Sequence, residues 1–89
     1  MSDRYLEVTY RGGRALAAYL YLPRVSSEKT VRTEKAAPGL LVDFAADGRP
    51  IGVEITSPRR VTVEALNAVL DELHVERLDS DEAAPLRAA

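Results

Sequence analysis

Cysteine and tryptophan are absent from this sequence of 89 residues, and histidine and phenylalanine occur once each. Without cysteine, neither a disulfide nor a thiolate metal site can form. No apolar run approaches the roughly 18 residues that a membrane-spanning helix needs. The N-terminal residues also lack the apolar segment of a signal peptide. These absences lead us to expect a cytoplasmic protein.

An excess of basic charge is also missing. The chain has 14 acidic and 12 basic residues, which gives a formal net charge of −2, and the two signs are interspersed. Nucleic-acid-binding domains usually carry a basic excess or a basic stripe, so nucleic acid is not the expected partner. The length fits one small domain, for which association with a second copy is a common source of stability.

An Asp-Gly pair lies between two runs in which apolar and polar residues alternate. This pattern predicts a hairpin with Asp47 and Gly48 as the two central turn residues, because glycine adopts the positive φ of tight turns. Such a turn would pair Leu40 with Ile55, Val42 with Val53, and Phe44 with Ile51. All six side chains would then lie on one face of the sheet, since successive side chains of a strand alternate.

Alternation also predicts strands over residues 4–10 and 15–22, joined at Gly12-Gly13. Residues 31–36 read as a polar strand suited to a sheet edge. A helix follows, with Ser57 or Thr62 as its N-cap. Its apolar residues recur at three- and four-residue spacing, which predicts one buried stripe: Val63, Leu66, Val69, Leu70 and Leu73.

Together these patterns predict an α+β fold. We expect an antiparallel β-meander of four to five strands in chain order, with one C-terminal helix packed on one face. The helix would cover the apolar face of the Asp-Gly hairpin. Residues 1–78 would form the single domain, and residues 79–89 a flexible acidic and Ala/Pro-rich tail, because they offer little apolar surface to bury.

Five segments between residues 18 and 55 resemble the pattern of the DUF2283 family, small bacterial and archaeal proteins of unknown function. They are Ala-Tyr-Leu-Tyr-Leu at 18–22, Thr-Glu at 33–34, Pro-Gly-Leu-Leu-Val-Asp-Phe at 38–44, Asp-Gly at 47–48 and Gly-Val-Glu-Ile at 52–55. They occur in the family's order and at one spacing.

The resemblance implies a small sheet with a helix and no catalytic motif or cofactor. Some family members lie beside genes for small toxins, which implies an antitoxin-like or accessory role with such a toxin as a protein partner. This chain departs from the family pattern in its longer segment over residues 23–29 and its longer helical C-terminus.

Asp43 and Glu54 form the candidate polar site, since both match the family's acidic positions and would be diagonal neighbours on the face opposite the apolar one. Two carboxylates there could share a proton or a cation, as a small enzyme or a ligand-binding protein requires. The alternative is a pair of solvated carboxylates beside Arg32, Lys35 or Arg49. We expect no metal site and no catalytic role for His74, which would complement the dipole of the helix end.

Tyr19, Tyr21 and Leu41 make that second sheet face too apolar to be left in water, so we predict a homodimer that buries it. Gly52 would be a bulge, a space for a tyrosine ring, or a point of approach for a partner chain. The sequence therefore predicts a non-enzymatic, self-associating interaction module. A weak nucleic-acid binder that stacks bases on its tyrosines is the remaining alternative.

Overall fold

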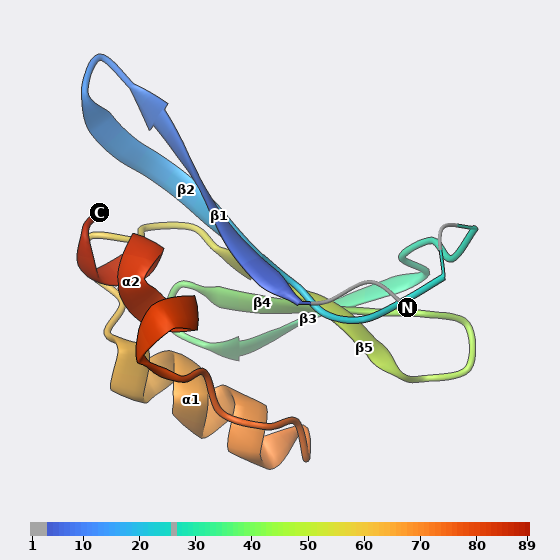
Figure 1. Cartoon of the computed structure of the whole chain (residues 1–89). Coiled ribbons are helices and arrows are strands. Elements are labelled where there is room, and N and C mark those ends of the chain that lie inside the picture. The colour runs from blue at the N-terminus through green and yellow to red at the C-terminus, as the bar shows by residue number, and fades with distance from the viewer. Residues whose placement is uncertain (1–3, 26) are drawn as a thin grey trace.

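The computed structural model describes residues 4–25 and 27–89; residues 1–3, which belong to the predicted domain, and residue 26 lie outside it. The described chain forms a five-stranded antiparallel sheet and two helices (Figure 1). The strands are β1 (Tyr5–Arg11), β2 (Arg14–Tyr21), β3 (Arg32–Ala37), β4 (Leu40–Phe44) and β5 (Pro50–Ile55). The helices are α1 (Val63–Glu72) and α2 (Ser80–Arg87). The predicted α+β class and antiparallel sheet are thus confirmed.

The strand order is β1-β2-β5-β4-β3, so it differs from the expected chain order. Strands β3, β4 and β5 form a meander, and β5 then pairs with β2 as well as with β4. Burial accounts for this arrangement, because β5 carries Ile51, Val53 and Ile55, all fully buried, and needs a neighbour on each side. The polar strand β3 lies at a sheet edge, as predicted, where charged side chains discourage pairing with another chain.

The Asp-Gly hairpin has the predicted pairing over most of its length. Leu40 pairs with Ile55 and Val42 with Val53, but a bulge after Asp43 places Phe44 opposite Pro50 instead of Ile51. The reason is a longer turn, in which the Gly48 N–H donates to the Ala45 carbonyl at 3.0 Å. Ala46 and Asp47 are therefore the central residues, and Gly48 follows them with φ +88°.

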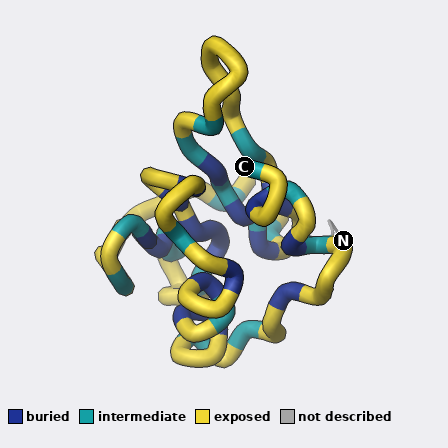
Figure 2. Tube along the Cα trace, turned by 90° about the vertical axis from the view of Figure 1, so that its left-hand side faces the viewer, coloured by how far each residue is buried: buried dark blue, intermediate teal, exposed yellow. Residues whose placement is uncertain are grey.

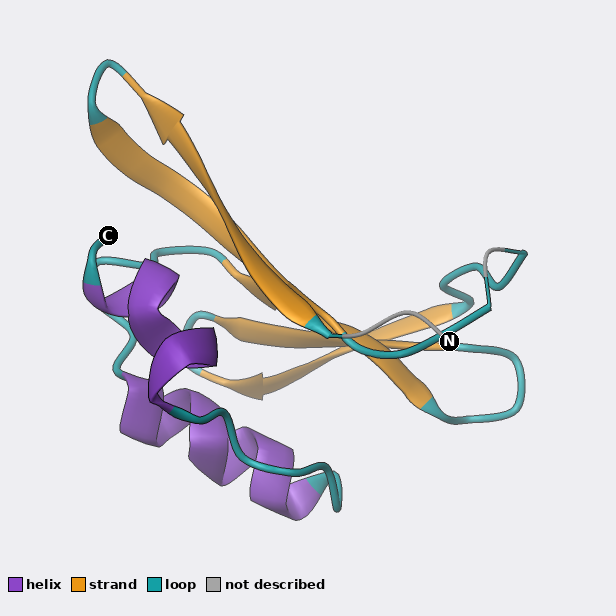
Figure 3. Cartoon of the chain, in the orientation of Figure 1, coloured by secondary structure: helices purple, strands orange, loops and turns teal. Residues whose placement is uncertain are grey.

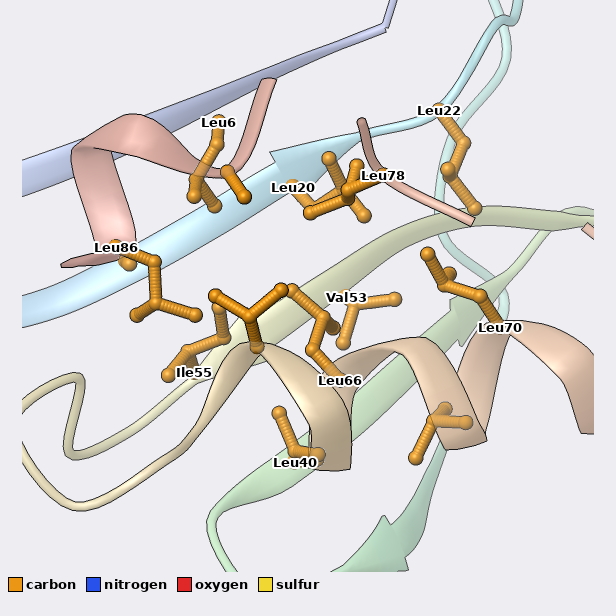
Figure 4. Close-up of a cluster of buried hydrophobic side chains, with 14 of the residues drawn as sticks. Leu6, Leu20, Leu22, Leu40, Val53, Ile55, Leu66, Leu70, Leu78 and Leu86 are labelled. Carbon is orange, nitrogen blue, oxygen red and sulfur yellow. The ribbon is translucent and has the colours of Figure 1, made fainter. Parts of the chain in front are cut away.

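Helix α1 begins after Thr62, which is one of the two predicted N-caps. The Thr62 hydroxyl accepts a hydrogen bond from the Ala65 N–H at 3.0 Å. The predicted stripe faces the sheet, with Leu66 and Leu70 fully buried. Leu66 of α1 and Leu86 of α2 point into the same cluster of apolar side chains as the sheet residues Leu20 and Val53 (Figure 4).

The expectation of a flexible tail over residues 79–89 is wrong, because residues 80–87 form α2. A capping box starts this helix: the Asp79 side chain accepts from the Glu82 N–H, and the Glu82 side chain accepts from the Asp79 N–H. Ala83 and Leu86 are buried in the main core. Both helices lie on the same side of the sheet (Figure 3).

Arg4 fixes α2 beside β1. Its guanidinium donates to both carboxylate oxygens of Glu82, at 2.7 and 2.9 Å, and to the carbonyls of Glu76 and Arg77. The hydrogen bonds from Arg4 lower the pKa of Glu82. A carboxyl group whose pKa is lowered by folding stabilises the fold above its ordinary pKa, and this contribution is lost as the pH falls into the acid range.

Candidate interaction face

The face of the sheet that points away from the helices carries two rows of side chains, each crossing all five strands. The first row runs Tyr5, Tyr21, Gly52, Asp43, Thr33. The second row runs Glu7, Tyr19, Glu54, Leu41, Lys35. We call these ten residues the open face. It contains every residue predicted for the interface and both residues of the predicted polar site.

Gly52 makes room for Tyr19. A Cβ atom at Gly52 would lie 1.9 Å from the Tyr19 hydroxyl oxygen, so the phenol ring lies directly over this glycine. The hydroxyl donates to Asp43 Oδ2 at 2.7 Å, and the Thr33 hydroxyl donates to Asp43 Oδ1 at 2.6 Å. Among the alternatives for Gly52, the structure therefore agrees with a space for a tyrosine ring. Gly52 itself is buried and pairs with Asp43, and the bulge of the hairpin follows directly on this pair, so the alternative of a bulge also agrees with the register.

Substituting Gly52 by alanine is expected to lower the free energy of unfolding by about 1–3 kcal/mol, because Tyr19 must leave Asp43. Urea denaturation followed by circular dichroism measures the change. In a Tyr19→Ala background the same substitution should be neutral or stabilising, since alanine loses less backbone entropy in a strand than glycine does. An equal cost in both backgrounds would contradict the placement of the ring over Gly52.

The other tyrosines of the open face form an aromatic group with Tyr19. Tyr5 and Tyr21 stack with ring centroids 4.6 Å apart, and Tyr19 meets Tyr21 edge-on at 4.7 Å. The Arg24 guanidinium lies 5.8 Å from the centre of the Tyr21 ring, and the Tyr21 hydroxyl donates to Glu7 at 3.3 Å. These contacts hold three aromatic rings in fixed positions on one surface.

The surroundings of Tyr19 and Tyr21 keep these two phenols protonated. Burial, followed by the hydrogen bond to Asp43, raises the pKa of Tyr19 well above its ordinary value. Burial and the neighbouring Glu7 carboxylate raise the pKa of Tyr21 as well. Neutral phenols donate hydrogen bonds to carboxylates but are poor nucleophiles near neutral pH, so this group is suited to contact rather than to proton transfer.

The two carboxylates of the predicted polar site are not joined to each other. Both oxygens of Asp43 accept hydrogen bonds from hydroxyl groups, whereas Glu54 is exposed and lies between Tyr19 and Leu41 in its row. His74 is exposed and follows the end of α1 with φ +58°. Within residues 4–25 and 27–89, no three His, Cys, Asp or Glu side chains gather in a way that could hold a metal ion.

Sequence reasoning missed Thr33 as a partner of Asp43. The signal was present in the alternation of β3, because Thr33 and Lys35 share one side of that strand, but it depends on a register that only the sheet defines. It also missed the pairing of Tyr5 with Tyr21 across the first hairpin. That pair follows from the Gly12-Gly13 turn once the bulge after Thr9 is known.

Comparison with known proteins agrees with the resemblance drawn from the residues. Residues 17–57 match the family model DUF2283, described as a protein of unknown function. The matched segment runs from within β2 to just beyond β5, so it contains Tyr19, Gly52 and Asp43. No curated protein and no solved structure matches the chain. No helix in the described part of the chain is long and apolar enough to cross a membrane.

Proposed function

We propose that this chain is a non-enzymatic interaction module that forms a homodimer through its open face. The observation that carries the proposal is the one-sided cover of the sheet: α1 and α2 lie on one face, and the other presents an aromatic group. Tyr5 is 53% exposed, although its ring is large and apolar. Aromatic side chains are enriched at the centres of protein interfaces because they bury much area in few rotamers.

The contacts within the face favour binding over catalysis. Tyr19, Tyr21 and Tyr5 are held by ring contacts and hydrogen bonds, so little side-chain entropy remains to be lost when a partner binds. Asp43 uses both oxygens to orient Tyr19 and Thr33, which leaves the alternative of an enzyme based on Asp43 and Glu54 without a free general base at Asp43.

The charges of the second row favour a second copy as the partner. Glu7 lies on the edge strand β1, Lys35 lies on the opposite edge strand β3, and both are exposed. A two-fold axis that runs along the central strand β5 would place Glu7 of one copy over Lys35 of the other, twice in the dimer. It would also place Tyr19 over Leu41. Such a self-complementary patch is what a two-fold interface requires.

A charge-swap series tests this arrangement. Glu7→Lys and Lys35→Glu should each weaken the dimer about tenfold or more, since each puts like charges opposite one another in both pairs. The double variant should bind nearly as well as the wild type. Sedimentation equilibrium at low salt measures the three dissociation constants. Additive weakening in the double variant would contradict the proposed axis.

The same axis places Glu54 beside its own copy. Two carboxylates close together repel, so Glu54→Gln is expected to tighten the dimer by a factor of about 3 or more in the same measurement. An unchanged dissociation constant would place Glu54 away from the axis. A toxin or another protein as the partner predicts instead a chain that remains monomeric in all of these variants.

A further inference from the structure

Five arginines lie at the end of the molecule formed by the β1–β2 hairpin tip, the turn before α1 and the end of α2. They are Arg11, Arg14, Arg59, Arg60 and Arg87. Across residues 4–25 and 27–89, none of their side chains forms an ion pair or a hydrogen bond. By contrast, Arg4, Arg32, Arg49 and Arg77 are all paired with carboxylates. The unpaired arginines are thus confined to one region.

The fold brings this region together from three parts of the chain. Arg11 and Arg14 are cross-strand neighbours near the tip of the β1–β2 hairpin, whose residues 9–14 are all exposed (Figure 2). A groove of about 460 Å³ separates the start of β2 from the turn that carries Arg59 and Arg60. A second groove, of about 280 Å³, joins Arg59 to Arg87 at the end of α2.

The groove beside β2 has the chemistry of an anion site. Arg59, Arg60 and Ser57 line it together with Ala15 and Leu16. Guanidinium groups bind phosphate oxygens in a bidentate manner, and a hydroxyl can donate a further hydrogen bond. Glu64 is the one acidic side chain of the described residues that lines the second groove. Arg11 directly opposite Arg14 is an unfavourable pair in isolation, and an anion between or beside them would relieve the repulsion.

We propose that this arginine end binds the phosphate backbone of single-stranded nucleic acid. The arginines extend along two adjoining grooves and onto the hairpin, which is a longer track than one phosphate group needs. Tyr10, which is 52% exposed, precedes Arg11 in β1 and presents its ring on the opposite side of the hairpin, where a base can stack. The sequence expectation against nucleic acid depended on the even charge balance of the whole chain, whereas the fold gathers five unpaired arginines from distant parts of the chain.

Fluorescence anisotropy with labelled oligothymidylate and oligouridylate of about 20 nucleotides tests the proposal. We expect affinity to fall with salt, with a slope of log K against log salt of about −2 to −3 for three to four phosphate contacts. The double variant Arg59→Gln/Arg60→Gln should weaken binding at about 50 mM salt by about tenfold or more. The double variant Arg32→Gln/Arg49→Gln removes the same charge elsewhere and should change it by less than about twofold.

The outcomes separate local binding from general electrostatics and from small anions. The proposal is supported if oligonucleotide binding weakens in Arg59→Gln/Arg60→Gln alone and the thermal midpoint of that variant is unchanged. It is overturned if both double variants lose oligonucleotide affinity equally. It is also overturned if neither oligonucleotide binds at low salt, whether or not pyrophosphate binds. Because the arginine end is separate from the open face, this result does not depend on whether the chain forms a dimer.

Discussion

Replacing Val53 by aspartate is expected to lower the free energy of unfolding by about 3 kcal/mol or more, a large part of the stability of a domain of this size. Val53 is fully buried on the central strand β5, between Leu20 of β2 and Val42 of β4. An aspartate there would be charged without a partner, or would have to bind a proton to enter the core.

The neighbouring residue provides the control. Glu54 points to the open face and is exposed, so Glu54→Gln should change the free energy of unfolding of the monomer by less than about 0.5 kcal/mol. Urea denaturation at low protein concentration compares the two variants. If Val53→Asp unfolded at nearly the same urea concentration as the wild type, the assignment of the two faces of β5 would be wrong.

Aspartate at Ala83 should also cost about 3 kcal/mol or more, whereas aspartate at Ala84 should cost less than about 1 kcal/mol. The two alanines are adjacent in α2, but Ala83 is fully buried in the core and Ala84 is exposed. The substitution, the charge and the helix propensity are therefore matched, and only burial differs.

This pair also tests whether the C-terminal segment is part of the domain. Thermal unfolding followed by circular dichroism gives both midpoints in one experiment. A segment that moved freely would tolerate both substitutions equally, so equal midpoints would contradict the packing of α2 against the core.

The sequence was sufficient to predict the central hairpin and its two faces. Alternation placed Val42 opposite Val53 and put Tyr19, Tyr21 and Leu41 on the second face, and the register agrees. Alternation describes each strand separately, however, and does not determine which strands become neighbours. The place of β5 between β2 and β4 depends on burial of β5 on both edges, which is a property of the assembled sheet.

Helix α2 could have been found from its start signal. Asp79 and Glu82 have the spacing of a capping box, and Ala83 and Leu86 lie three residues apart on one side of the helix. The low apolar content of the segment argued against a helix, because alanine buries little area and Pro85 interrupts the apolar spacing of a helix. Its stability comes from tertiary contacts, including the hydrogen bonds between Arg4 and Glu82.

The candidate site was predicted in outline but not in its contacts. Asp43 and Glu54 are diagonal neighbours, as expected, but the hydrogen-bond partners of Asp43 are hydroxyl groups from two other strands. The arginine end was not predicted at all. Arg59-Arg60 is too short a run to indicate a basic patch in the sequence, and Arg14 and Arg87 join that region only when the hairpin and α2 are in place.

Self-association through the open face determines the molar mass of the protein in solution. Light scattering coupled to size exclusion at about 100 μM protein should give about twice the mass of one chain, with a thermal midpoint that rises with concentration. Tyr21→Asp, which places a carboxylate within the aromatic group and opposite Asp43 of the second copy, should give the mass of a single chain. A wild-type chain that remains a monodisperse monomer at this concentration would contradict self-association through the open face.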